Sequence, residues 1–157
     1  MANQDGNRKV RILFVCSSNT CCSVMAQSMM QTMVDSIGLS GRFLIDSAAC
    51  GKIRQNAAVD EQAREKLHAM NIPVIEHKPR QMTWGDYDKY DYLIGMDEWN
   101  IDDMRYITGS DPDRKICKLS SFAGADKDIG DPWYTNDYDT AYQDIQEGLM
   151  GLLNKLT

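Results

Sequence analysis

KVRILFVCSSNTCCSVMAQSMMQ, residues 9–31, is the stretch that decides the fold. It opens with a short apolar, β-branched run over residues 10–15, which is typical of a buried strand. Apolar residues at helical spacing follow from Met25 to Val34, and small polar residues with three cysteines lie between the two. A strand that passes through a tight turn into a helix directs backbone N–H groups, and the positive end of the helix dipole, at one place. The stretch therefore predicts an anion site at this turn.

Cys16, the first residue of the turn, is the candidate nucleophile. The N–H groups and the dipole that attract an anion also stabilise a thiolate, so we expect the pKa of Cys16 to lie below the free value of about 8.5. The alternative is an unreactive buried thiol, which is the commonest fate of a single cysteine.

Strand and helix patterns alternate along the whole chain. Strands are predicted at residues 10–15, 42–46, 92–96 and 115–119. Helices are predicted at residues 23–37, 60–70, 83–87 (capped by Thr83), 98–107 and 139–156, with loops at 47–59 and 120–135. The alternation indicates an α/β fold with a parallel sheet and right-handed crossovers. We expect a single domain at residues 9–157, preceded by a flexible arm at residues 1–8.

The ends of the predicted strands gather polar side chains. Ligands of a parallel α/β sheet bind beyond the carboxyl ends of its strands. Cys16, Ser47, Asp97 and the loop after Leu119 all fall at such ends. A nucleophile and an acid are therefore expected to meet at this edge of the sheet.

Composition excludes several classes of partner. The net charge of −6 over 157 residues disfavours nucleic acid and anionic membrane surfaces. No apolar run approaches the roughly 20 residues that span a bilayer, and the first nine residues lack the apolar core of a secretory signal. Five cysteines without the spacing of a disulfide scaffold fit a reducing compartment. We expect a cytoplasmic protein.

Residues 16–27 resemble the phosphate-binding loop of low-molecular-weight protein tyrosine phosphatases, C-x-G-N-x-C-R-S-P-M-A-E. They read Cys16-Ser17-Ser18-Asn19-Thr20-Cys21-Cys22-Ser23-Val24-Met25-Ala26-Gln27. The resemblance continues in the family's order at residues 46–49, 77–83, 90–97 and 131–134. It implies a three-layer sandwich of the phosphotyrosine phosphatase I type, with a four-stranded parallel sheet of order 2-1-3-4.

The same resemblance implies an activity and its partners. The family hydrolyses phosphotyrosine through a phosphocysteine, here on Cys16, without metal or cofactor. The substrate would be a phosphotyrosine-containing protein or a small aryl phosphate, and inorganic phosphate would be product and inhibitor.

Site residues carry over position by position. Cys16 would be the nucleophile and Asp131 the acid that protonates the leaving phenolate, although an Asp before Pro is also common in turns. The phosphate-binding loop would comprise Ser17, Ser18, Asn19, Thr20, Cys21, Cys22 and Ser23. The other implied roles are loop support by Asn19, Ser47 and His77, a pocket wall of Ile53, Trp133 and Tyr134, and a reversible disulfide between Cys16 and Cys21. Ser23 alone also fits a plain helix N-cap, and His77 a partly exposed loop histidine.

The chain departs from the family pattern at three positions of the site. Cys22 replaces an Arg that grips two phosphate oxygens, and by analogy with arginine fingers its loss costs about 10³–10⁵ in rate. Ser18 replaces a Gly, which allows backbone angles that Ser tolerates poorly. Ile53 replaces an aromatic wall residue. We therefore expect weak or absent phosphatase activity.

Two other functions remain open. One is a non-catalytic phosphate- or phosphopeptide-binding pseudophosphatase. The other is a thiol-redox protein akin to the arsenate reductases of this fold, although those place redox cysteines after the third strand and Cys117 falls on the fourth. Zinc binding by the cysteines is disfavoured, because adjacent cysteines in a tight loop do not match the usual C-x₂₋₄-C ligand spacing.

Overall fold

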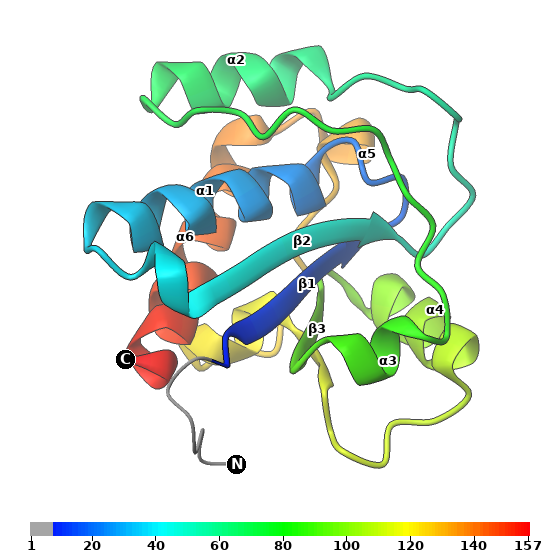
Figure 1. Cartoon of the computed structure of the whole chain (residues 1–157). Helices are drawn as coiled ribbons and strands as arrows, with labels where there is room; N and C mark the ends of the chain where they lie inside the picture. The colour runs from blue at the N-terminus through cyan, green and yellow to red at the C-terminus, as the bar shows by residue number, and fades with distance from the viewer. Residues whose placement is uncertain (1–7) are drawn as a thin grey trace.

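The computed structural model describes residues 8–157, and a four-stranded parallel sheet forms its centre. The strands are β1 (Val10–Cys16), β2 (Phe43–Ala49), β3 (Tyr92–Gly95) and β4 (Ile116–Lys118). Their order is β2-β1-β3-β4, which confirms the predicted topology (Figure 1). The predicted arm at residues 1–8 lies outside the described residues except for Arg8, whose Nη2 atom lies 2.6 Å from Asp91 Oδ1.

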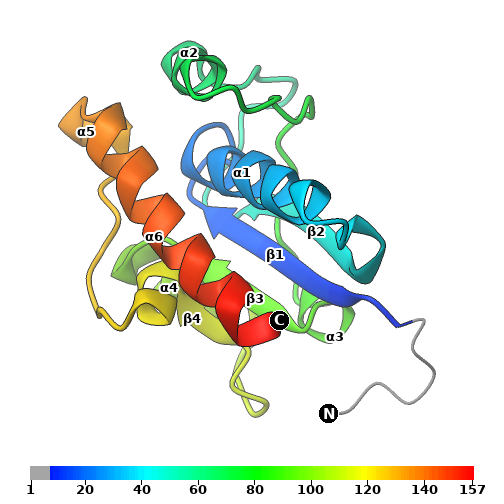
Figure 2. The same ribbon diagram turned by 90° about the vertical axis from the view of Figure 1, so that its left-hand side faces the viewer.

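Helices cover both faces of the sheet and complete three layers (Figures 1 and 2). One face carries α1 (Cys22–Ser36), α2 (Glu61–Ala69) and α6 (Tyr138–Leu156), and the other carries α3 (Asp86–Lys89) and α4 (Glu98–Thr108). Short helical turns are η1 (Ser40–Arg42), η2 (Leu119–Ala123) and α5 (Pro132–Thr135). No helix of residues 8–157 is long and apolar enough to cross a membrane.

Residues 12–15 of β1 are apolar without alternation because both faces of the strand are covered there. Ile12 and Phe14 pack into the core under α1 and α6, whereas Leu13 and Val15 pack against α4, and all four are fully buried. This burial fixes the position of Cys16 at the carboxyl end of β1, where the strand passes into the turn.

Helix α6 lies unusually close to the backbone after β4. At Gly148 the Leu119 side chain and carbonyl occupy the space that a Cβ atom would need, and at Gly151 the Phe122 carbonyl does the same. The glycines therefore allow η2 to rest against the helix. This contact anchors the start of the long segment that leads to Asp131.

The predictions for the end of β2 and for the short helix before β3 were wrong. Strand β2 continues through Ala49, where a loop was predicted from residue 47, because β1 pairs with it as far as Cys16 and Ala49. Ala49 also bonds to the backbone of Arg80 and Met82. The short helix runs over Asp86–Lys89 rather than 83–87, and Thr83 does not cap it; instead the Asp86 carboxylate accepts the Thr83 N–H at 2.8 Å.

The predicted loop at residues 120–135 also contains structure. Its end forms the single turn α5, in which Asp131 Oδ1 accepts the Trp133 N–H at 3.0 Å and Pro132 holds the first helical position. Capping by Asp and a Pro at this position are both favourable at a helix start. The turn thus orients the Asp131 carboxylate.

Candidate active site

The turn between β1 and α1 wraps around the Cys16 thiol. Cys16 ends β1 and Cys22 begins α1, so the intervening residues reverse the chain over the helix N-terminus. Cys16 is 8% exposed, and its Sγ lies 3.0 Å from Ser23 Oγ. The backbone N–H groups of Asn19 and Ser23 also point at this sulfur. The turn therefore directs donors at one atom, as an anion cradle requires.

Asn19 braces the turn from inside. It is fully buried in the left-handed conformation, with φ of 59°, which Asn adopts more readily than most residues. Its Nδ2 donates to Ser23 Oγ at 2.8 Å and to Ser47 Oγ at 3.0 Å, and its Oδ1 accepts the Arg80 N–H at 3.1 Å. His77 Nε2 lies 3.4 Å from the Asn19 carbonyl. The structure thus brings together the residues that were predicted as loop support.

The hydrogen bonds continue into residues that sequence reasoning missed. Ser47 Oγ donates to Gln27 Oε1 at 2.6 Å, and Gln27 Nε2 donates to the Ile45 carbonyl at 3.2 Å. This chain links α1, the turn and β2 through buried polar groups. Gln27 is the last residue of the loop motif. A polar residue on the buried face of the helix was the only sequence signal that it takes part in these hydrogen bonds.

Ser18 does not hold the strained backbone that was expected of it. Among residues 8–157, the turn has one residue with positive φ, and that residue is Asn19. A Gly at position 18 would therefore relieve no left-handed strain here. The positive φ that would have favoured Gly over Ser is therefore not found at position 18.

A pocket opens where the turn faces the loop after β3 and the segment before α5. It is lined by Cys16, Ser17, Ser18, Cys21, Cys22, Met96, Asp97, Asn100, Ile129 and Asp131. Cys16 and Asp131, the predicted nucleophile and acid, thus share one pocket. Its charged lining consists of two carboxylates, and no Lys, Arg or His is among these residues. The nearby Arg80 is bound to Asp86 at 3.2 Å and does not reach the pocket.

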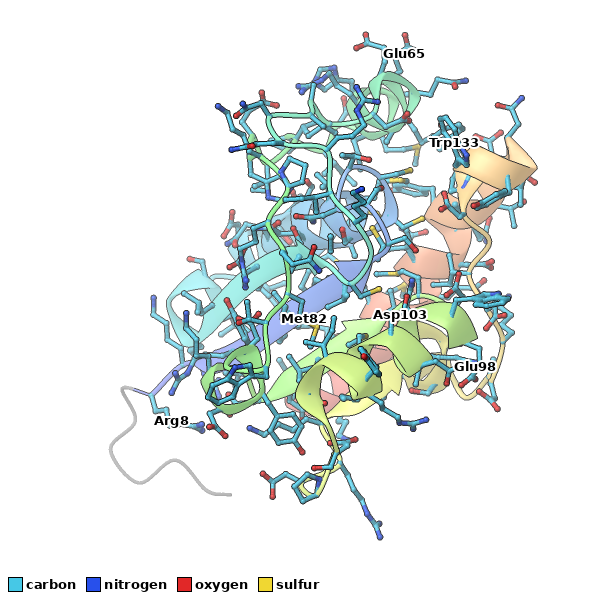
Figure 3. The ribbon with its side chains drawn as sticks, turned by 90° about the vertical axis from the view of Figure 1, so that its right-hand side faces the viewer. Arg8, Glu65, Met82, Glu98, Asp103 and Trp133 are labelled. Atoms are coloured by element: carbon cyan, nitrogen blue, oxygen red, sulfur yellow. The ribbon has the colours of Figure 1, made fainter. Side chains whose placement is uncertain are left out.

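Of the three residues predicted to form the pocket wall, only Tyr134 lies beside the pocket. A groove continues from the pocket and is lined by Ser17, Asp97, Trp99, Asp103, Asp128, Ile129, Gly130, Asp131 and Tyr134. Ile53 and Trp133 line neither the pocket nor the groove, and the Trp133 side chain is 81% exposed on α5 (Figure 3). Tyr134 does line the groove, and so does Trp99 of α4, which was not predicted from the sequence.

Comparison with known proteins identifies the family. Residues 11–157 match the model described as low molecular weight phosphotyrosine protein phosphatase. The chain belongs to this family. It is 31% identical over 146 residues to the low molecular weight protein-tyrosine-phosphatase YfkJ of Bacillus subtilis, covering 92% of this chain and 94% of YfkJ. The crystal structure of YfkJ covers 94% of both chains with a TM-score of 0.89 at 30% identity.

A second relative extends the similarity to eukaryotes. The low molecular weight phosphotyrosine protein phosphatase of Saccharomyces cerevisiae is 31% identical over 141 residues, covering 85% of this chain and 86% of the yeast protein. The family match covers residues 11–157, so it includes the turn, the segment that contains Asp131 and the C-terminal helix.

In this member of the family Asn100 joins the two sides of the pocket. It occupies the third position of α4 in a capping box with Asp97, whose Oδ1 accepts its N–H at 2.8 Å. Asn100 Oδ1 accepts the Met96 N–H at 3.0 Å, and its Nδ2 donates to Ser17 Oγ at 3.3 Å and Cys50 Sγ at 3.6 Å. The D-x-x-N spacing after the third strand was the signal that could have identified it.

The expected depression of the Cys16 pKa is wrong. Burial raises the pKa of the Cys16 thiol above its ordinary value, and the hydrogen bonds from Ser23 and the Asn19 N–H offset only part of this effect. The pKa of Cys22 is raised well above its ordinary value by a hydrogen bond with the Cys21 thiol and by burial. Both groups are therefore neutral thiols near pH 7, and the pocket lacks the positive charge that would stabilise a thiolate.

Alkylation should reveal this raised pKa. Since the thiolate is the reacting form, labelling of Cys16 by iodoacetamide should be slow at neutral pH and accelerate beyond about pH 8.5, the pKa of a free thiol. Mass spectrometry of the intact folded chain across pH measures the profile, and Cys16→Ser identifies its contribution. Half-maximal labelling of Cys16 below neutral pH would contradict the raised pKa.

The thiols do not form a metal centre in this structure. Among residues 8–157, no group of three or more His, Cys, Asp or Glu side chains is arranged to hold a metal ion. All five cysteines are free. Three of them, Cys16, Cys21 and Cys22, line the pocket, whereas Cys117 lies on β4 outside it.

Proposed function

We propose that this chain is a phosphotyrosine phosphatase framework in which hydrolysis of aryl phosphates is weak or absent because Cys22 replaces the phosphate-gripping Arg. The charge of the pocket lining supports this proposal most directly. A phosphate dianion would meet the carboxylates of Asp97 and Asp131 and no cationic side chain. Backbone N–H groups alone would have to offset that repulsion, whereas an Arg would supply charge and two parallel hydrogen bonds.

The proposed reaction uses the residues that face the pocket. The Cys16 thiolate attacks phosphorus in line as Asp131, in its protonated form, donates its proton to the departing phenolate oxygen, which leaves phosphate bonded to Cys16 and Asp131 as a carboxylate. Water then attacks the phosphocysteine, Asp131 takes a proton from the water, and inorganic phosphate and the thiolate are released. The Ser23 hydroxyl, 3.0 Å from the sulfur, stabilises the leaving thiolate. These steps require neither metal nor cofactor.

The raised pKa of Cys16 adds a second barrier to the first step. The thiol must lose its proton before it attacks, and each pKa unit above the working pH costs about 1.4 kcal/mol. An Arg beside the sulfur would lower this cost as well as bind phosphate. The single change at residue 22 thus weakens both substrate binding and the nucleophile.

The proposed partners follow from this reaction. The substrate is a phosphotyrosine-containing protein or a small aryl phosphate, and inorganic phosphate is the product and a weak inhibitor. Five free cysteines support a reducing compartment, and we propose the cytoplasm.

A binding protein is the second candidate, and the intact cradle favours it. Asn19 and Ser23 still direct donors at Cys16, so phosphate binding without turnover is compatible with the site. A redox function has less support because Cys117 lies outside the pocket, although three thiols share the pocket.

Two measurements on the unmodified chain test the proposal. Hydrolysis of p-nitrophenyl phosphate should be far below the ordinary kcat range of about 1–10³ s⁻¹, with Cys16→Ser as the baseline. Added phosphate should raise the melting temperature only slightly, because stabilisation follows the ratio of ligand concentration to Kd. An ordinary kcat would overturn the proposal. Turnover equal to the Cys16→Ser baseline, together with a clear phosphate shift, would favour the binding protein.

A further inference from the structure

The groove beside the pocket contains two aromatic side chains that the interior does not cover. Trp99, in the first turn of α4, is 77% exposed, and Tyr134 of α5 is 84% exposed. Both line the groove. Large aromatic rings exposed on a concave surface are typical of recognition sites, since their faces attract apolar and cationic groups.

The groove also carries negative charge that is only partly paired with basic side chains. Asp97, Asp103 and Asp131 line it, and within residues 8–157 none of them forms an ion pair. Asp128 differs, because Lys118 Nζ lies 3.1 Å from its Oδ1. Three carboxylates without an ion pair therefore lie beside two exposed rings, and Asp97 and Asp131 each use one oxygen to cap a helix.

The groove is continuous with the pocket. Ser17, Asp97, Ile129 and Asp131 line both. Figure 3 shows Asp103 and Glu98 on α4, on the same side of the molecule as α5 with Trp133. A peptide whose modified residue enters the pocket would place its neighbouring residues over α4.

We propose that this groove binds a Lys or Arg side chain of a peptide whose neighbouring residue occupies the Cys16 pocket. The inference rests on the proposed function only in taking a peptide as the pocket's partner. Carboxylates pair with the cation, and the faces of Trp99 and Tyr134 hold it by cation–π contact. A peptide with acidic residues at the same place would be repelled by Asp97, Asp103 and Asp131. The groove thus selects partners with basic residues beside the tyrosine.

Two pairs of fluorescent peptides test this selection by anisotropy with the unmodified chain. One pair contains phosphotyrosine flanked by Lys and Arg or by Glu, and the other contains unphosphorylated tyrosine with the same flanks. The basic peptide should bind about tenfold more tightly within each pair, and added salt should reduce the difference because charge complementarity is screened. Equal affinity of basic and acidic peptides would overturn the proposal.

Variants on α4 localise the effect. Trp99→Ala should weaken binding of the basic peptide about two- to fivefold, the scale of an exposed cation–π contact. Asp103→Asn should weaken it and reduce its salt dependence. Asp102→Asn and Tyr106→Ala are the matched controls, since both residues are exposed on the same helix outside the groove, and neither should change affinity. If the two control variants lost as much affinity for the basic peptide as the Trp99 and Asp103 variants, the groove would not be its binding site.

The unphosphorylated pair separates this inference from the proposed function. If the chain prefers basic to acidic peptides but binds phosphotyrosine and tyrosine peptides equally, the groove proposal stands and phosphate binding in the pocket is contradicted. Preference for phosphotyrosine without basic selectivity would retain the proposed function and reject the groove.

Discussion

Replacing Cys22 with Arg is expected to raise kcat/KM for p-nitrophenyl phosphate by about 10³ or more, the scale of a phosphate-gripping Arg. Cys22 is 3% exposed at the first position of α1 and lines the pocket with Cys16. A guanidinium there would offset the two carboxylates and bind two phosphate oxygens in ground and transition states. It would also lower the pKa of the Cys16 thiol by stabilising the thiolate.

Two companion variants define the cause of any gain. Cys22→Lys supplies charge without the planar fork, so its recovery should be smaller than that of Cys22→Arg. Cys16→Ser in the Arg variant should abolish the recovered activity, because the nucleophile is lost. Partial recovery would implicate another departure such as Ile53, while Ser18 is a weaker suspect because its backbone φ is not positive. An Arg variant that is no faster than its parent would mean that the turn is shaped for something other than phosphoryl transfer.

The elements that were predicted correctly are those with a strong local signal. The apolar run at residues 12–15 indicated a buried strand, and the structure buries Leu13 and Phe14 on opposite sides of the sheet. The predictions failed where contacts with other segments of the chain determine the local structure. Strand β2 extends to Ala49 because β1 pairs with it as far as Cys16 and Gln81 forms a bridge to Ala49 on its other side. Thr83 does not cap the short helix, because the Asp86 carboxylate binds the Thr83 N–H.

The same distinction applies to the site. The turn motif was enough to place Cys16 and Asn19, and the D-x-x-N spacing after the third strand was a local signal for Asn100. Trp99 lines the groove through the position of α4, which a single sequence does not reveal. The Cys16 pKa was mispredicted for a related reason. Its N–H donors are local and were anticipated, whereas the burial that outweighs them depends on how the whole domain closes over the sulfur.

Asp131→Asn in the Cys22→Arg background is expected to reduce hydrolysis of phosphotyrosine by about 10²–10⁴, the usual contribution of a general acid. The same change should affect p-nitrophenyl phosphate much less, because nitrophenolate leaves readily without a proton. The ratio of kcat for the two substrates is therefore the measurement. Asn is a suitable replacement because it caps a helix about as well as Asp, so α5 and its N–H bond to residue 131 should be retained.

Asp137→Asn provides the matched control for this capping role. Asp137 caps α6 by accepting the Thr140 N–H at 3.0 Å, and it lies outside the pocket and the groove. The Asp137→Asn variant should leave the kcat values for phosphotyrosine and p-nitrophenyl phosphate, and their ratio, unchanged. Equal losses on the two substrates for Asp131→Asn would indicate that Asp131 orients the turn or the substrate rather than protonating the leaving group. A selective loss on phosphotyrosine requires proton donation, because a distorted pocket would slow both substrates alike.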